Sequence, residues 1–171
     1  MIILAIGGSG SGKSAWAERV IARAGLEKRY YIATMQAFDG ESKKRVTRHR
    51  AQRAALGFET LEKPLNVGEI RLAGPAAVLL EDLPNLLANE MFGSGSPGRI
   101  LPGLESLARQ SEILVIVSGN VFSDGIRYDE STQDYIRQLA ALNSQIAQRA
   151  DTVAEVVYSI PVALKGALPC V

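Results

Sequence analysis

A glycine-rich stretch near the N-terminus matches the pattern G-x-x-x-x-G-K-[ST] of a phosphate-binding loop: Gly7, Gly8, Ser9, Gly10, Ser11, Gly12, Lys13, Ser14. Glycines let backbone N–H groups turn inward around phosphate oxygens, because no Cβ atoms interfere. Lys13 is expected to take part in catalysis by bridging the β and γ phosphates, and the hydroxyl of Ser14 is expected to ligate Mg²⁺. The motif follows the apolar run Ile2–Ile6 and opens a helix, which a flexible Gly/Ser linker would not do. The sequence therefore predicts a nucleoside triphosphate site.

Two adjacent carboxylates, Glu81 and Asp82, follow another apolar run, Ala77–Leu80. An acid at the end of a second strand holds Mg²⁺ through water in phosphate-loop enzymes. Such a residue can also cap the next helix, here with Pro84 in its first turn. Both roles can coexist on neighbouring residues. We expect Glu81 to hold the metal together with Ser14.

The segment Lys43–Arg53 carries six cationic side chains and the only histidine of the chain, His49. Helical spacing would gather five polar side chains on one face: Arg45, Arg48, His49, Gln52, Arg53. The like charges on such a face repel one another, and a bound polyanion would relieve this repulsion. The surrounding cations would lower the pKa of His49 and keep its imidazole neutral and nucleophilic. The residues alone leave three interpretations open: a solvated surface helix, a nucleic-acid patch, or a nucleotide-phosphate site with a reactive histidine.

Short apolar runs alternate with longer amphipathic stretches, which predicts one α/β domain over residues 1–171. The expected strands are Ile2–Ile6, Arg29–Ala33, Ala77–Leu80, Ile113–Ser118, Val153–Tyr158 and a short one near Val162–Leu164. The expected helices are Lys13–Ala24, Glu41–Ala55, Leu83–Met91, Arg99–Gln110 and Thr132–Arg149. Crossover helices between strands imply a mainly parallel sheet with helices on both faces.

Two breaks in this pattern have possible functions. Gly93–Gly98 is a Gly/Ser-rich loop, which would serve as a surface connection or as a lid over a ligand. Gly119–Glu130 follows a buried strand and is rich in polar residues. Because ligands of open α/β sheets bind beyond the carboxyl ends of the strands, this loop is a candidate wall of the site.

Composition excludes several classes of protein. Hydrophobic residues make up 47% of the chain and the formal net charge is +1, so neither disorder nor a nucleic-acid-coating surface is expected. The single cysteine, Cys170, cannot support a disulfide framework, and one histidine cannot build a His-rich metal site. The N-terminal MIILAIGG does not resemble a signal peptide, and no apolar run is long enough to span a membrane. A cytoplasmic protein is expected.

Several segments occur in the order typical of one family. They are ILAIGGSGSGKS (Ile3–Ser14), YIATMQ (Tyr31–Gln36), RVTRHRAQR (Arg45–Arg53), LEKPL (Leu61–Leu65), VLLE (Val78–Glu81), ALNSQIAQRA (Ala141–Ala150) and VVYSIPVALKG (Val156–Gly166). The chain resembles the bifunctional adenosylcobinamide kinase / adenosylcobinamide-phosphate guanylyltransferase family of cobalamin biosynthesis, over about residues 1–166. The phosphate loop is shared by many proteins, whereas YIAT followed by R-x-x-R-H-R is far more specific.

The resemblance implies a phosphate-loop NTPase fold with a RecA-like sheet, two reactions and a trimer. ATP or GTP would phosphorylate the aminopropanol hydroxyl of adenosylcobinamide, with Mg²⁺. GTP would then guanylylate a histidine, and the corinoid phosphate would take the GMP from it. His49 matches that histidine. The remaining nucleotide-contacting segments of the family match Thr34, Met35, Gln36, Arg50, Ala51, Gln52, Arg53, Glu62 and Glu81.

One departure concerns the corinoid substrate. Where many relatives read N-E-V-G after the late strand, this chain reads GNVFSDG over residues 119–125, so the family's glutamate cannot be carried over. Two rival functions stay open on the residues alone. One is a phosphate-loop kinase of another small hydroxyl substrate, and the other is a nucleotide-dependent switch without chemistry of its own.

Overall fold

The computed structural model describes residues 1–35, 56–120 and 128–170 of the chain. The described strands are β1 (Ile2–Ile6), β2 (Arg29–Ala33), β3 (Phe58–Glu62), β4 (Ala77–Glu81), β5 (Ile113–Val117), β6 (Thr152–Val157) and β7 (Ile160–Lys165). The described α-helices are α1 (Lys13–Arg23), α3 (Leu83–Phe92), α4 (Ile100–Gln110) and α5 (Glu130–Arg149). Two short 3-10 turns, Val67–Glu69 and Pro97–Arg99, join them.

These seven described strands form one sheet in the order β3-β2-β4-β5-β1-β6-β7. Neighbouring strands are parallel from β3 through β6, and β7 is antiparallel to β6. The first strand therefore lies inside the sheet, with Ile2 opposite Leu114 of β5 and Ile3 opposite Thr152 of β6. Parallel strands bring their carboxyl ends to one edge, which is where open α/β sheets bind ligands.

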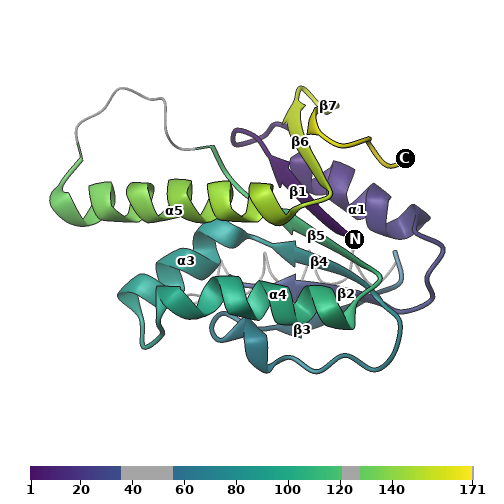
Figure 1. Cartoon of the computed structure of the whole chain (residues 1–171), viewed down its shortest axis with the longest axis horizontal. Helices are drawn as coiled ribbons and strands as arrows, with labels where there is room; N and C mark the ends of the chain where they lie inside the picture. Colours follow the sequence, from purple (N-terminus) through teal and green to yellow (C-terminus); the bar gives the residue numbers. More distant parts are fainter. Residues whose placement is uncertain (36–55, 121–127, 171) are drawn as a thin grey trace, which may run out of the picture.

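The helices cover both faces of the sheet, as the sequence predicts. One face packs against α3, α4 and α5, with Leu86, Leu104 and Leu139 in the shared core (Figure 1). The other face packs against α1, whose Trp16 and Ile21 are fully buried. Alternate residues of the inner strands serve the two cores, because successive side chains point to opposite faces. Nearly continuous apolar runs such as Ile113–Val117 follow from this double burial.

Most predicted elements are present, with boundaries that differ by one or two residues. Strand β6 ends at Val157, because Tyr158 and Ser159 both have positive φ and turn the chain into β7. Helix α5 begins two residues earlier than predicted, since the carboxylate of Asp129 accepts from the N–H of Thr132 at 2.9 Å and caps it. Helix α4 begins one residue later than predicted, because Pro97–Arg99 form a separate 3-10 turn.

Strand β3 was not predicted. Its sequence FETLE is half polar, and only Phe58 is buried, so the periodic apolar signal is weak. Phe58 makes an edge-to-face contact with Tyr31, with ring centroids 6.0 Å apart. The predicted helix Glu41–Ala55 lies outside the described residues. None of the helices in the described part of the chain is long and apolar enough to cross a membrane.

Candidate functional site

The phosphate-loop residues Gly7–Ser14 connect β1 to the start of α1, as their pattern predicts. The N–H of Ser11 donates to the carbonyl of Gly8 at 3.2 Å, and the N–H of Trp16 donates to that of Gly12 at 3.0 Å. The ammonium of Lys13 donates to the same Gly8 carbonyl at 3.0 Å. The lysine is thus folded over its own loop. The N-terminal end of α1 adds a favourable field for anions at this place.

Gly12 needs its missing side chain. Its φ is 89°, a left-handed conformation that favours glycine, and a Cβ atom here would collide with the side chain of Ser159. Ser159 also donates its N–H to the carbonyl of Ser11 at 2.7 Å. The turn between β6 and β7 is therefore packed directly against the phosphate loop.

A chain of hydrogen bonds joins the loop to the acid at the end of β4. The hydroxyl of Ser14 donates to Oε1 of Glu81 at 2.5 Å, and the hydroxyl of Tyr31 donates to Oε2 of the same carboxylate at 2.7 Å. Strand β5 lies between β1 and β4, so this carboxylate reaches across a neighbouring strand. A serine hydroxyl and a carboxylate are the oxygen ligands that Mg²⁺ prefers.

These two groups are the protein oxygens best placed for a magnesium ion. Within the described residues there is no group of three or more His, Cys, Asp or Glu side chains that could hold a metal by themselves. Mg²⁺ is usually held by few protein ligands, with waters and substrate phosphates completing its shell. The pair Ser14 and Glu81 therefore fits a nucleotide-bound Mg²⁺ rather than a resident metal centre.

Asp82 has the capping role that the sequence left open. Its carboxylate accepts from the N–H of Asn85 at 3.2 Å and so caps α3. Burial raises the pKa of Asp82 above its ordinary value of 3.8, and the neighbouring charge of Glu81 raises it further, against opposing effects of the Asn85 hydrogen bond and of Lys13. The two adjacent acids thus have different roles. Glu81 faces the phosphate loop, and Asp82 caps the N-terminus of α3.

Thr34 and Asn89 fix the end of β2 to its neighbours. The buried hydroxyl of Thr34 donates to the carbonyl of Asp82 at 2.8 Å and accepts from the N–H of the same residue at 2.9 Å. The amide of Asn89 donates to the carbonyls of Thr34 and Pro64 at 2.8 and 3.1 Å. The N–H of Thr34 also donates to the carbonyl of Glu81 at 3.2 Å, so both the side chain and the backbone of Thr34 are engaged within the protein.

The other predicted site residues divide into two groups. Glu62 and Glu81 lie at the same level of the sheet, since both pair with Ala33 at the carboxyl end of β2. Met35 follows them and is 48% exposed. The remaining predicted residues lie outside the described residues: Gln36, His49, Arg50, Ala51, Gln52 and Arg53.

The two loops singled out in the sequence are partly described. The N–H of Asn120 donates to the carbonyl of Gly7 at 3.3 Å, so the start of Gly119–Glu130 borders the phosphate loop, as predicted. Residues 121–127 lie outside the described residues. In Gly93–Gly98, the N–H of Ser96 donates to the buried carboxylate of Glu90 at 2.6 Å, which fits a surface connection.

Two residues of this site were not identified from the sequence. Tyr31 was noted only as part of the YIAT segment, and its bond to Glu81 depends on the alignment of β2 and β4. Ser159 lies far along the chain from the phosphate loop, and only the pairing of β6 with β1 brings it there. The alternation of apolar residues carries no signal for such contacts.

The model of the family described as "Cobinamide kinase / cobinamide phosphate guanyltransferase" matches residues 3–164 of this chain. A curated relative from Pseudomonas aeruginosa, the bifunctional adenosylcobalamin biosynthesis protein CobP, is 35% identical over 95% of this chain and 96% of its own length. The bifunctional adenosylcobalamin biosynthesis protein CobU of Salmonella typhimurium is 29% identical over 96% of this chain and 100% of its own.

Solved structures agree with the fold at low sequence identity. The flagellar accessory protein FlaH of Methanocaldococcus jannaschii has a TM-score of 0.52 and 11% identity, and the match covers 96% of this chain and 78% of that one. The protein PH0250 of Pyrococcus horikoshii has a TM-score of 0.50 and 9% identity, over 98% and 87% of the two chains. These matches concern the α/β phosphate-loop fold alone.

Proposed function

The chain belongs to the cobinamide kinase / cobinamide phosphate guanyltransferase family, and on that premise we propose that Gly7–Ser14 bind the nucleoside triphosphate for both reactions. The protein is a bifunctional enzyme of adenosylcobalamin biosynthesis. It phosphorylates cobinamide and then transfers a guanylyl group to cobinamide phosphate. The observation that carries the site is the hydrogen-bonded set of Ser14, Glu81 and Tyr31 beside the glycine loop.

In the kinase step, the cobinamide hydroxyl attacks the γ-phosphorus of the nucleotide. A new O–P bond forms, and the nucleoside diphosphate leaves with the electrons of the bond between the γ-phosphorus and the β,γ-bridging oxygen. The hydroxyl proton passes to water. Lys13 neutralises charge on the β and γ phosphates, and the loop N–H groups orient them. Mg²⁺, held by Ser14 and through water by Glu81, would supply charge neutralisation at the same phosphates.

In the guanylyltransferase step, His49 is the proposed nucleophile. A neutral imidazole nitrogen attacks the α-phosphorus of GTP, a P–N bond forms, and pyrophosphate leaves with the electrons of the α,β P–O bond. A phosphate oxygen of cobinamide phosphate then attacks the same phosphorus, and the P–N bond breaks. A covalent intermediate divides a difficult transfer into two displacements. The support for His49 is the resemblance of RVTRHRAQR to the family, together with its being the chain's single histidine.

The histidine is tested by incubating the protein with Mg²⁺ and GTP that carries 32P at its α-phosphate. We expect a labelled protein whose bond is labile in acid and stable in alkali, and no label in His49→Ala. A label that persists in His49→Ala would refute the assignment of the nucleophile. A wild-type protein that stays unlabelled while it phosphorylates cobinamide would favour the rival function, a kinase without guanylyl transfer.

The shared loop is tested with Lys13→Ala, which should abolish both activities because one cradle holds both nucleotides. A matched control is Lys28→Ala, since the Lys28 ammonium donates to the carbonyl of Ala73 and not to the loop. Both reactions are measured by incubating each protein with adenosylcobinamide, GTP or ATP and Mg²⁺. The products are then identified by mass spectrometry. Loss of only one activity in Lys13→Ala would mean that the two reactions use different phosphate sites.

The resemblance also implies a trimer. The outer strand β7 supports a subunit contact, because its residues Ile160, Val162 and Leu164 are 65%, 47% and 56% exposed. Exposed apolar residues on an edge strand are typical of surfaces that pair with another chain. Sedimentation equilibrium tests this proposal, which requires a mass three times that of the 18.4 kDa chain.

A further inference from the structure

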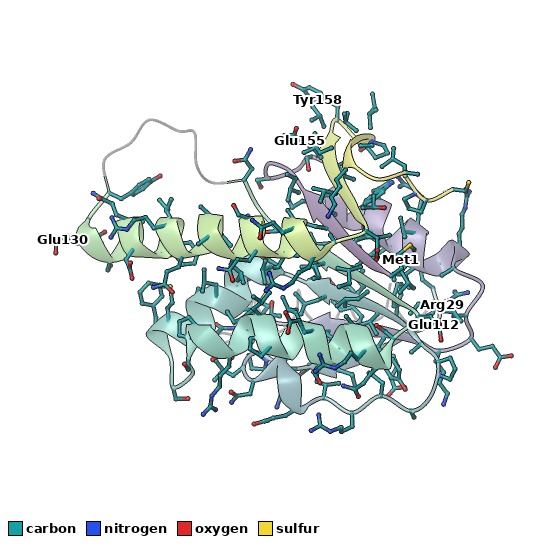
Figure 2. The ribbon with its side chains drawn as sticks, in the orientation of Figure 1. Met1, Arg29, Glu112, Glu130, Glu155 and Tyr158 are labelled. Carbon is teal, nitrogen blue, oxygen red and sulfur yellow. The ribbon has the colours of Figure 1, made fainter. Side chains whose placement is uncertain are left out.

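Tyr158 is the most exposed aromatic residue that the structure describes. It is 90% exposed, and Phe92 is the only other exposed aromatic residue in the described part of the chain. Figure 2 shows Tyr158 at the outer tip of the turn between β6 and β7. Its φ of 50° is also uncommon for a residue with a side chain. Packing within the described residues therefore gives no reason for a tyrosine here.

The turn that carries Tyr158 is joined to the phosphate loop. The next residue, Ser159, donates its N–H to the carbonyl of Ser11 at 2.7 Å and lies against Gly12. On the other side of the turn, the carbonyl of Val156 lies 2.6 Å from where a Cβ of Gly7 would be. The position of Tyr158 relative to the loop is therefore fixed by contacts before and after it.

The strand order gives a direction to a bound nucleotide. Ser14, in the helix that follows β1, donates to Glu81 at the end of β4, so the groups suited to the metal and the terminal phosphates lie on the β4 side of the loop. The phosphate chain then leads away from Glu81, so the ribose and base leave the loop on the opposite side of β1. That side is occupied by β6 and its turn.

We propose that the ring of Tyr158 is a stacking platform for the base of the nucleotide held by Gly7–Ser14. Every base has an aromatic face, and stacking on tyrosine is tolerant of base identity. Such a platform would help the site to accept either a guanine or an adenine nucleotide. The proposal rests on the proposed function of the phosphate loop and adds a base-binding residue to it.

The test is calorimetric titration, with Mg²⁺, of the β,γ-imido analogues of ATP and GTP and of inorganic tripolyphosphate. Tyr158→Ala should raise the Kd of the two nucleotides by roughly 5-fold or more, as loss of a base–aromatic stack does. Tyr158→Phe should stay within about twofold of the wild type, because the ring face is kept. Tripolyphosphate, which has no base, should bind all three proteins equally. Phe92→Ala is the matched control, because it removes another exposed aromatic ring, at the C-terminal end of α3.

Three results would overturn the proposal. Nucleotide Kd values unchanged in Tyr158→Ala would show that the ring does not contact the base. An equal loss of tripolyphosphate binding would mean that the residue shapes the loop instead. A changed sedimentation mass with unchanged nucleotide Kd would assign the ring to a subunit contact. If the wild type binds none of the three ligands, or if Lys13→Ala binds them normally, the phosphate-loop assignment itself fails, and the base site with it.

Discussion

The hydroxyl of Tyr31 donates to Oε2 of Glu81 at 2.7 Å, across two adjacent strands. The other oxygen of that carboxylate accepts from Ser14 at 2.5 Å. Tyr31 is only 2% exposed, and its ring is packed against Phe58. A buried, immobile donor therefore fixes the orientation of the acid that faces the phosphate loop. In metal sites, such supporting hydrogen bonds strengthen binding by orienting the ligand.

Tyr31→Phe should raise the Mg²⁺ concentration that both activities require. The ring and its packing stay, but Oε2 of Glu81 loses its donor and the carboxylate gains freedom to rotate. We expect the Mg²⁺ concentration for half-maximal kinase activity to rise roughly 10-fold, the lower range for loss of a ligand's supporting bond. Titration of Mg²⁺ at saturating nucleotide measures it.

Tyr30→Phe is the control for this substitution. Tyr30 is buried in the same strand, but it belongs to the core on the opposite face of the sheet, away from Glu81. Its variant should keep the wild-type Mg²⁺ curve. Equal shifts in both variants would mean that the effect comes from a weakened strand rather than from the bond to Glu81.

Asp82→Asn should change how stability depends on pH. The pKa of Asp82 is raised by burial, so the folded protein holds this proton more tightly than the unfolded chain does. The stabilisation is fully present below the ordinary pKa of 3.8 and is lost as pH rises through the raised folded value. Asparagine also caps helices well, so the variant should keep the cap but should not lose stability in this way as the pH rises. The melting temperature of the variant relative to wild type should therefore increase as pH rises from about 3 to about 6.

The comparison needs a variant without the cap. Asp82→Ala removes the carboxylate that accepts from Asn85 and should lower the free energy of unfolding by about 1 kcal/mol relative to Asp82→Asn. Urea unfolding of the two variants measures the difference. A melting difference between wild type and Asp82→Asn that is constant with pH would contradict a raised pKa.

Gly12→Ala should destabilise the protein and disrupt nucleotide binding. Alanine is strained at a φ of 89°, which costs about 1–3 kcal/mol, and its Cβ would collide with Ser159. Gly8→Ala is the control, since a Cβ there meets no atom within 4 Å. Urea unfolding measures the cost. Adding Ser159→Gly should recover part of it, and a double variant no better than Gly12→Ala would argue against the contact.

The sequence predicts the local features of this protein better than the long-range ones. The phosphate loop, the apolar strands and the cap signal before α3 are short, contiguous patterns, and they are found in the structure. Strand β3 was missed because an edge strand with one buried residue has little apolar periodicity. The choice between Glu81 and Asp82 as helix cap could not be made from the sequence, because both acids stand at the end of the same strand.

The contacts that complete the site depend on the order of strands. Tyr31 reaches Glu81 because β2 lies next to β4, and Ser159 reaches Gly12 because β6 lies next to β1. Periodicity tells which residues are buried but not which strands are neighbours. Predicting contacts between residues so far apart in the chain requires knowledge of the strand order, and the sequence pattern alone is compatible with several strand orders.

The position of β1 inside the sheet has a consequence for the protein as it leaves the ribosome. Both neighbours of this strand, β5 and β6, are made long after it, and the turn that contacts Gly12 follows β6. The phosphate loop is synthesised well before the turn that supports it, because that turn is complete only when residue 159 has emerged. Nascent chains that stop before this turn would carry the complete loop motif without its neighbours, so nucleotide binding during translation should begin only after this turn has emerged.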